Sequence, residues 1–175
     1  LLDMLTPNDL SDITSQIINS CKKKDKKLFY LLKMLNCRIP IDLCSYLNLS
    51  YSSLLKEGII VREERYIFVS NEFVKQAVMK ETSDLVNEQN ISELILDFCT
   101  HNPGKYKDVI IYGLFYAGKL EEATKEIDLL IKELGQKRNF TLMLEFIELA
   151  ITISENNKNA HALSNYLIKK LEVYA

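Results

Sequence analysis

Residues that could carry catalysis are few and scattered in this sequence. His101 and His161 fall in different helical segments, and neither has a nucleophile and an acidic residue spaced around it as acyl-transfer chemistry requires. Paired carboxylates occur at Glu121–Glu122 and at Glu145 with Glu148, where the helical period places them on solvated faces of amphipathic helices. We therefore predict that the chain is not an enzyme.

The four cysteines also lack the spacing of a ligand set. Cys21, Cys37, Cys44 and Cys99 form no Cys-x-x-Cys pair and have no histidine at zinc-finger distance, which predicts buried, reduced thiols. The phosphate-binding pattern Gly-x-x-x-x-Gly-Lys-[Ser/Thr] does not occur in this sequence either. We expect no metal and no cofactor in this fragment, and no tight ATP binding by it alone.

The composition is that of a helical, soluble protein. A chain of 175 residues with 47% hydrophobic and 26% charged residues can form one large or two small domains, and only five Gly and three Pro favour long helices. No run approaches the roughly 20 apolar residues of a membrane span, and no signal peptide opens the chain. We expect a cytoplasmic protein with no membrane partner, cut from a longer chain because it begins with Leu1.

The net charge of −2 is unevenly distributed. Residues 1–80 hold 12 Lys or Arg against 9 Asp or Glu, whereas residues 81–175 hold 10 against 15. Five lysines within 22–27 predict a solvated hinge more than a nucleic-acid patch. The small positive excess is too weak to predict nucleic-acid binding, which normally requires a concentrated basic face.

Residues 1–24 are expected to form an N-terminal helix and a basic hinge. Thr6 is the expected N-cap, and Pro7 suits the first helical position because its missing N–H would be unbonded there. The apolar positions at helical spacing are Leu10, Ile13, Ile17 and Ile18.

Residues 25–81 predict a winged helix-turn-helix with a small β-hairpin. Apolar positions from Leu28 to Leu35 (Leu28, Leu31, Leu32, Leu35) follow the spacing of a first helix, and Pro40 suits the first turn of a second. A third short helix has Ser50 or Ser52 as its N-cap and ends at Gly58 in positive φ.

The hairpin and a closing helix complete this domain. Ile59–Val61 and Tyr66–Val69 are β-prone runs, and the charged residues 62–65 between them predict a turn. Asn71 is expected to cap the next helix, whose apolar face would be Phe73, Val74, Ala77 and Val78.

Residues 82–175 predict antiparallel pairs of helices. Helical periods begin near Ile91, Val109, Leu120, Phe140 and Ala160, and the stops between them include Gly118 and Gly135. The segment 110–123 looks like a tetratricopeptide repeat, with Gly118 at the inter-helix turn and Ala123 where the helices pack closest. The next such turn, at 156–159, comes roughly 38 residues later rather than the ~34 of a regular repeat.

In this order, the elements resemble the regulatory region of STAND-type signalling ATPases. The matching stretches are Leu5–Leu10, Leu54–Ile60, and Tyr66–Ser70 running into Phe73–Ala77. The resemblance implies a winged helix that acts as a switch, helical repeats that sense a protein partner, and an ATPase domain upstream. It also implies a concave partner surface on the first helix of the repeat, at Lys105, Asp108, Tyr112 and Phe115. The alternative for Tyr112 and Phe115 is packing against the neighbouring helix.

The alternative function is a transcriptional regulator whose winged helix binds DNA and whose repeat domain receives a peptide or protein signal. Its DNA contacts would come from the third helix and the hairpin, at Ser50, Tyr51, Ser53, Lys56, Arg62 and Arg65. Glu57 and Glu63–Glu64 lie among these residues and would repel phosphates, so DNA is not the favoured partner.

Overall fold

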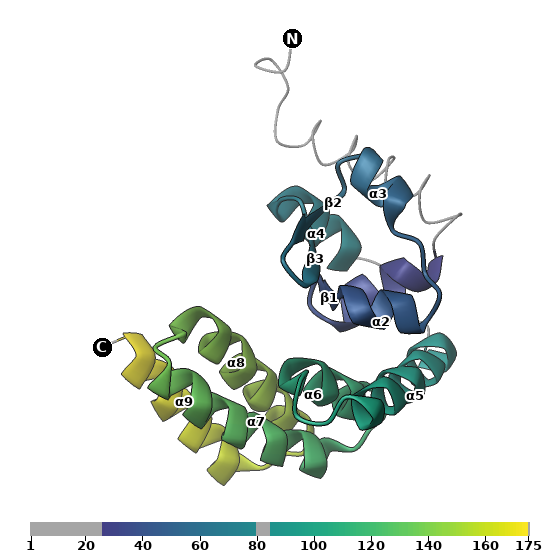
Figure 1. Ribbon diagram of the computed structural model, residues 1–175. Coiled ribbons are helices and arrows are strands. Elements are labelled where there is room, and N and C mark those ends of the chain that lie inside the picture. The colour runs from purple at the N-terminus through teal and green to yellow at the C-terminus, as the bar shows by residue number, and fades with distance from the viewer. Residues whose placement is uncertain (1–25, 80–84, 175) are drawn as a thin grey trace. The chain divides into compact units, whose positions relative to one another are not determined.

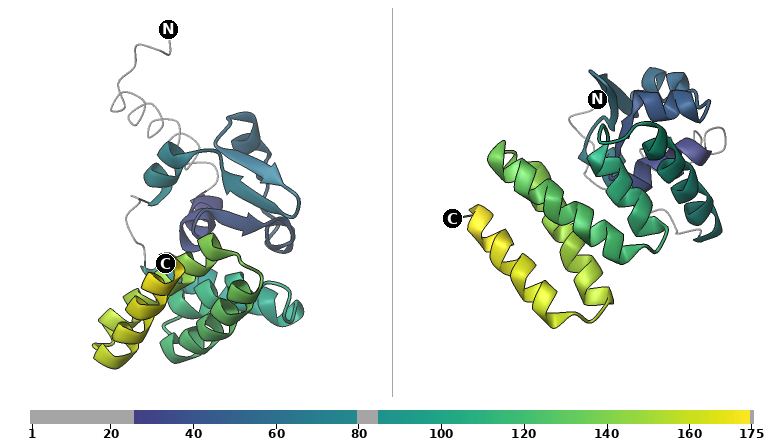
Figure 2. Two further views of the ribbon diagram at one scale, coloured as in Figure 1. Left: turned by 90° about the vertical axis from the view of Figure 1, so that its left-hand side faces the viewer. Right: turned by 60° about the horizontal axis from the view of Figure 1, so that its bottom comes forward.

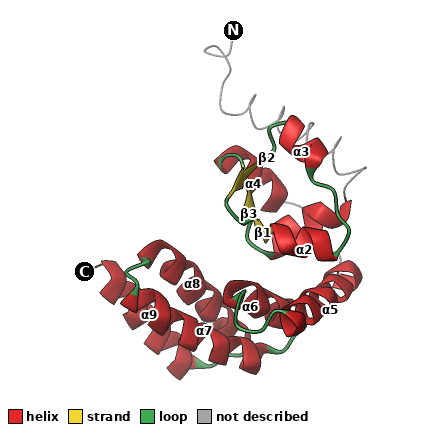
Figure 3. Cartoon of the chain, viewed as in Figure 1, coloured by secondary structure: helices red, strands yellow, loops and turns green. Residues whose placement is uncertain are grey.

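The computed structural model describes residues 26–79 and 85–174, which are mainly helical and contain one small antiparallel sheet (Figures 1 and 3). The expectation of a mainly α-helical chain is therefore confirmed. The helix and hinge expected over residues 1–24, with the cap at Thr6, lie outside the described residues. The chain divides into two compact units, of which the first ends at Phe98 and the second begins at Cys99.

The first unit is built on a buried helix over residues 26–34. The side chains that the leucine spacing predicted to be internal, from Leu28 to Leu35, are at most 2% exposed. Asn36 and Cys37, in the turn that follows the helix, take positive φ values of 48° and 66°. The Cys37 N–H donates to the Leu32 carbonyl at 2.6 Å, which satisfies a carbonyl of the last turn.

A three-stranded antiparallel sheet follows, in the order β1-β3-β2. β2 (Ile60–Glu63) and β3 (Tyr66–Val69) form the predicted hairpin, and the left view of Figure 2 shows the two strands side by side. Arg62 and Glu63, which were predicted to lie in the turn, instead extend β2 and pair with β3. β1 (Arg38–Pro40) pairs with β3 and was not predicted. Pro40 ends this edge strand and is the N-cap of the next helix, so placing it in the first helical turn was wrong by one position.

Three short helices accompany the sheet. α2 (Ile41–Tyr46) and α3 (Ser52–Lys56) lie between β1 and β2 in the sequence, and α4 (Glu72–Met79) follows β3. The N-cap of α3 is Tyr51, without a side-chain cap, so neither predicted serine cap is correct. Gly58 does adopt positive φ (68°), and the Val74 N–H donates to Asn71 Oδ1 at 3.1 Å, as predicted. Phe73 is 42% exposed, which contradicts its place on the buried face of α4.

α5 (Leu85–His101) begins six residues before the helical period recognised at Ile91. Two polar contacts attach it to the first unit. Lys33 Nζ lies 3.3 Å from Glu88 Oε1 in a buried ion pair, and the Tyr46 hydroxyl donates to Asp97. The Tyr46 ring also packs edge-on against Phe98, with the ring centroids 5.5 Å apart.

The second unit continues as four antiparallel helices: α6 (Lys107–Tyr116), α7 (Leu120–Gln136), α8 (Phe140–Asn156) and α9 (Ala160–Tyr174). Each helix packs on the one that follows it. Alternate helices also touch, because the Tyr112 and Phe146 rings join α6 to α8 at 5.7 Å, and the Tyr166 hydroxyl joins α9 to Asp128 of α7 at 3.1 Å. The helices thus form two layers, α6 with α8 and α7 with α9.

The turns between these helices recur every 20 residues. Gly118, Arg138 and Lys158 each take positive φ, at 73°, 55° and 53°. The backbone N–H of the residue after each of them donates to the carbonyl five residues before that donor, at 2.9–3.0 Å. This hydrogen bond is typical of the Schellman motif at a helix C-terminus. Gly135 lies inside α7 and is not the predicted stop, because the positive φ falls on Arg138 instead.

Candidate functional site

The residues expected to contact a partner lie along one side of α6 and in the turn before it. Lys105 is exposed, and its ammonium lies 4.9 Å from the centre of the Tyr106 ring. Asp108 is half-buried in the first turn of α6, and Phe115 is half-buried near its end. Three of the four residues therefore lie on α6, and Lys105 lies in the turn before it.

Tyr112 differs from the other three because its side chain is only 8% exposed. Its hydroxyl donates to Glu145 Oε1 of α8 at 2.7 Å, and its ring packs against Phe146. A buried, hydrogen-bonded tyrosine holds two helices together, and little of its surface is accessible to a partner. Phe115 packs edge-on against Tyr116, with centroids 5.1 Å apart, and keeps part of its surface exposed.

The residues considered as DNA contacts lie in α3, in the two residues before it and in the β2–β3 hairpin. Ser50, Lys56, Arg62 and Arg65 are exposed, whereas Tyr51 and Ser53 are half-buried. The three exposed cations are matched by three exposed carboxylates on the same segment, at Glu57, Glu63 and Glu64. This surface therefore carries no net charge, whereas phosphate binding needs a surplus of positive charge.

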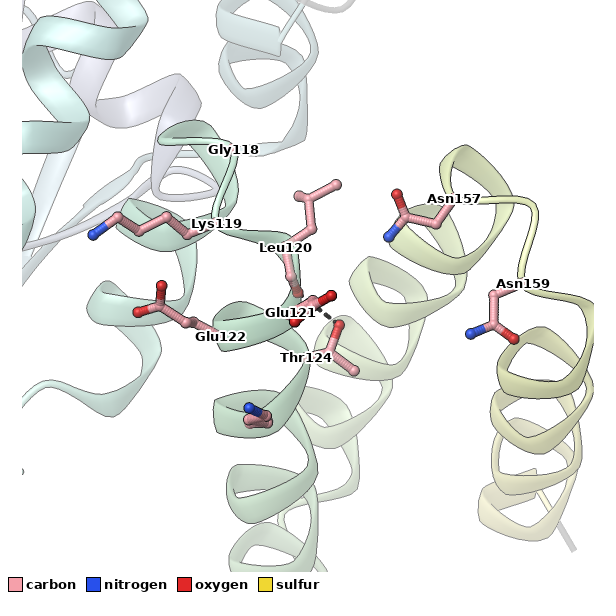
Figure 4. Close-up of a pocket in the computed structure, with 9 residues that line it drawn as sticks. Gly118, Lys119, Leu120, Glu121, Glu122, Thr124, Asn157 and Asn159 are labelled. Carbon is pink, nitrogen blue, oxygen red and sulfur yellow. Dashed lines mark hydrogen bonds between the residues drawn. The ribbon is translucent and has the colours of Figure 1, made fainter.

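An open depression of about 950 Å³ lies where the α6–α7 turn and the α8–α9 turn come to the same edge of the second unit (Figure 4). Asn157 and Asn159 point toward α7 from one side, and Leu120, Glu121 and Thr124 line the other. Two of its nine lining residues are lysines and two are glutamates, so their charges cancel. Binding pockets for small molecules are usually enclosed and apolar, and this depression is neither.

Residues with catalytic potential remain dispersed in the structure. His101 and His161 are both exposed, as are Glu121 and Glu122. Glu145 is half-buried and accepts the Tyr112 hydrogen bond, so its predicted place on a solvated face was wrong. Within residues 26–79 and 85–174, no group of three or more His, Cys, Asp or Glu side chains is placed to hold a metal ion.

Three cysteines, Cys37, Cys44 and Cys99, are buried thiols, as the sequence predicted, whereas Cys21 lies outside the described residues. Burial raises the pKa of Cys44 to about 11. Burial, and then the charge of Asp108, raise the pKa of Cys99 to about 12. Because the thiolate is the reactive form, these thiols should be inert in the folded chain.

We expect the Cys21→Ser variant to show no fast-reacting thiol toward Ellman's reagent at pH 8, and three after denaturation. At that pH only about one Cys44 thiol in a thousand is ionised, and burial blocks access as well. Fast release of one or more equivalents from the folded variant would contradict the burial of these cysteines.

Glu133 of α7 is held by two lysines at the exposed side of the second unit. The Lys107 ammonium lies 2.5 Å from one carboxylate oxygen, and the Lys137 ammonium lies 2.6 Å from the other. The hydrogen bond from Lys107, and then that from Lys137, lower the pKa of Glu133 to about 2. The ionised carboxylate is therefore favoured in the folded state.

This depressed pKa predicts a pH dependence. An unfolded Glu titrates near 4.3, so the stabilisation by Glu133 is fully present above about pH 5 and is lost as the pH falls toward 2. We expect the melting temperature of the Glu133→Gln variant to fall less steeply across this window than that of the wild type. Glu155→Gln, which changes an exposed glutamate of α8, is the control, and parallel curves for all three proteins would contradict the prediction.

One surface was missed by the sequence analysis. α9 exposes four large apolar side chains, Leu167, Ile168, Leu171 and Tyr174, with exposed fractions from 46% to 69%. The period of α9 indicated an apolar face, but a period alone does not say whether a neighbouring helix covers it. The only signal in the sequence is that apolar residues occupy more of α9 than a single buried stripe needs.

Of the helices in the described part of the chain, none combines the length and apolar character that crossing a membrane requires. Comparison of the chain with models of protein families, with curated proteins and with solved structures gives no match.

Proposed function

We propose that this chain is a non-catalytic, regulatory and protein-interaction part of a larger signalling ATPase of the STAND type. The first unit acts as a winged-helix switch element. Helices α6–α9 act as a tetratricopeptide-like sensor that receives a protein partner. No cofactor is needed by this part of the protein, and the setting is cytoplasmic.

The order of elements carries the proposal. A helix over 26–34 is followed by β1, α2, α3, β2 and β3, and the sheet order is β1-β3-β2. Two helices placed between an edge strand and a hairpin are what a winged helix-turn-helix requires. Antiparallel helix pairs then follow directly along the chain, which supports the combination of switch and repeat.

The two-layer arrangement of α6–α9 supports the sensor role. In stacked helix pairs, one layer lines the binding face. We propose that α6 and α8, which the Tyr112 and Phe146 rings join, are that layer. The pairs repeat every 40 residues, which is longer than the ~34 of a regular tetratricopeptide repeat. We therefore propose a tetratricopeptide-like array instead of regular repeats, with a partner surface that centres on Lys105, Asp108 and Phe115.

In the proposed mechanism, a partner bound on α6 changes how the first unit docks on the upstream ATPase. A partner can shift this equilibrium only if it binds the two docked states with different affinities. The consequence would be gated oligomerisation of the ATPase.

The coding sequence upstream of Leu1 is the first test. We expect a phosphate-binding loop and an acidic Mg²⁺-binding strand within about 300 residues. In that longer protein, removing residues 99–175 should change ATP-dependent oligomerisation, measured by light scattering. An upstream sequence without a phosphate loop would overturn the proposal.

Binding to duplex DNA distinguishes the alternative function. The neutral surface of α3 and the hairpin leads us to expect no salt-sensitive binding by fluorescence anisotropy, even at low ionic strength. Binding that is lost on changing Lys56, Arg62 and Arg65 together would favour the transcriptional regulator instead.

A further inference from the structure

α9 carries a row of exposed residues at the spacing of a coiled-coil seam. Ala160, Ser164, Leu167, Leu171 and Tyr174 follow one another at intervals of four, three, four and three, and all five are exposed. The opposite side of α9 packs on α8, and its Tyr166 hydroxyl bonds to α7. The right view of Figure 2 shows α9, in yellow, at the edge of the α6–α9 stack. We call these five residues the α9 seam.

The seam is strongly apolar for an exposed surface. Leu171 is 69% exposed and Tyr174 is 67% exposed, and Ile168 extends the row on one side at 54%. Ser164 adds little polarity, because its hydroxyl donates to the Ala160 carbonyl at 2.9 Å within the helix. Contiguous exposed apolar rows of this kind mark binding surfaces. A heptad spacing indicates that the occupant is another helix.

The size of the seam residues changes along the helix. The N-terminal half carries the small residues Ala160 and Ser164, and the C-terminal half carries the large residues Leu171 and Tyr174. Two copies of α9 placed antiparallel would set the small half of each against the large half of the other. Such an arrangement centres on Leu167 and is self-complementary, as a twofold interface must be.

We propose that α9 pairs antiparallel with α9 of a second copy of this chain, so that the α9 seam is the contact of a symmetric dimer. Together with α8 of each copy, the contact would form a four-helix arrangement. The pairing needs neither an ATPase domain nor a partner on α6, so its failure and that of the proposed function are separate results.

The charges next to the seam allow this pairing. Lys169 bonds to Asp128 at 3.1 Å and Lys170 to Glu148 at 2.9 Å, so both cations are matched within their own copy. In the antiparallel register centred on Leu167, Glu172 of one copy lies beside His161 of the other. Residues 99–175 hold ten Lys or Arg and ten Asp or Glu, so two copies do not repel each other through net charge.

The exposed apolar area of α9 determines how strongly we expect the dimer to associate. The large side chains of the seam and Ile168 offer on the order of 400 Å² per copy, about half of the ~800 Å² per partner in a standard stable interface. We therefore expect a weak dimer, with a dissociation constant in the micromolar range.

Sedimentation equilibrium of the 175-residue chain between about 5 and 500 µM tests the pairing. We expect a reversible monomer–dimer equilibrium, and at least a tenfold higher dissociation constant for Leu171→Glu. The matched control is Leu129→Glu, which alters a leucine of α7 that is 64% exposed but lies outside the seam, and it should leave the equilibrium unchanged. A chain that is monomeric throughout, or equal weakening by both variants, would overturn the proposal. Circular dichroism establishes that each variant is folded.

Cysteine cross-linking tests the orientation. In the antiparallel pair, position 167 of one copy faces position 167 of the other. The Leu167→Cys variant should therefore form a disulfide-linked dimer under mild oxidation. Ala160→Cys and Tyr174→Cys should cross-link when mixed, and neither should do so alone. The unsubstituted chain, treated in parallel, measures the background from the native cysteines. Self-cross-linking by Ala160→Cys alone would show a parallel arrangement and would overturn the proposed pairing.

Discussion

Replacing Phe146 by Ala is expected to lower the free energy of unfolding by about 3–5 kcal/mol. The ring is fully buried in α8 and packs against Tyr112 of α6, with the centroids 5.7 Å apart. Its removal loses the transfer free energy of the ring and leaves a cavity between the two helices, which backbone shifts fill only in part. Urea unfolding followed by circular dichroism measures the change as a fall in the midpoint.

Phe140→Ala is the matched control for this variant. Phe140 lies in the same helix but is 49% exposed, so its removal should cost less than about 1 kcal/mol. Because the chain has two compact units, the loss in Phe146→Ala should be confined to the transition of the second unit wherever two transitions are seen. Similar midpoints for the two variants would mean that Phe146 is not part of a packed core.

The long helices were predictable because their apolar periodicity is strong and their ends carry local signals. The leucines of residues 28–35 are all buried, and Asn71 caps α4 through its side chain. Asn156 to Asn159 form the α8–α9 turn where polar residues interrupt the period. In each case a local interaction decides the structure, so a single sequence contains the information.

Elements that depend on tertiary partners were not predictable. β1 has only three residues and ends in a proline, so its strand conformation comes from pairing with β3. Gly135 looked like a helix stop, but α7 continues to Gln136 and the positive φ of its Schellman end falls on Arg138, despite the cost of positive φ for a side chain. Tyr51 became the cap of α3 although two serines flank it.

The exposure of the α6 partner surface and of the α9 seam also depends on tertiary contacts. The family resemblance placed Tyr112 on the partner face, with packing against a neighbouring helix as the alternative. The sequence could not decide between the two, whereas in the structure α8 covers the ring and Glu145 accepts the hydrogen bond of its hydroxyl. The period of α9 predicted a helix, and it could not say that Leu171 would remain exposed. Which helix faces are covered depends on how the pairs stack, and this is decided by contacts between segments far apart in the sequence.

Replacing Lys33 by Met is expected to destabilise the first unit by about 3–5 kcal/mol. The Lys33 and Glu88 side chains are 10% and 7% exposed, and their charged atoms lie 3.3 Å apart across the contact between the 26–34 helix and α5. The variant removes the ammonium and leaves a buried carboxylate that has lost its counter-charge. Desolvation of that charge is costly, whereas the removed methylene groups are replaced by similar apolar volume.

The double variant Lys33→Met, Glu88→Leu separates the cost of a lone buried charge from the value of the pair. With both charges removed, we expect most of the stability to return, because well-packed apolar side chains can replace a buried ion pair without loss. Lys170→Met is the exposed control. Its partner Glu148 is 58% exposed and lies 2.9 Å away, so solvent screens that pair, and breaking it should cost much less stability than Lys33→Met does. If Lys33→Met lowers the free energy of unfolding no more than Lys170→Met does, the Lys33–Glu88 ion pair is hydrated in solution and not buried.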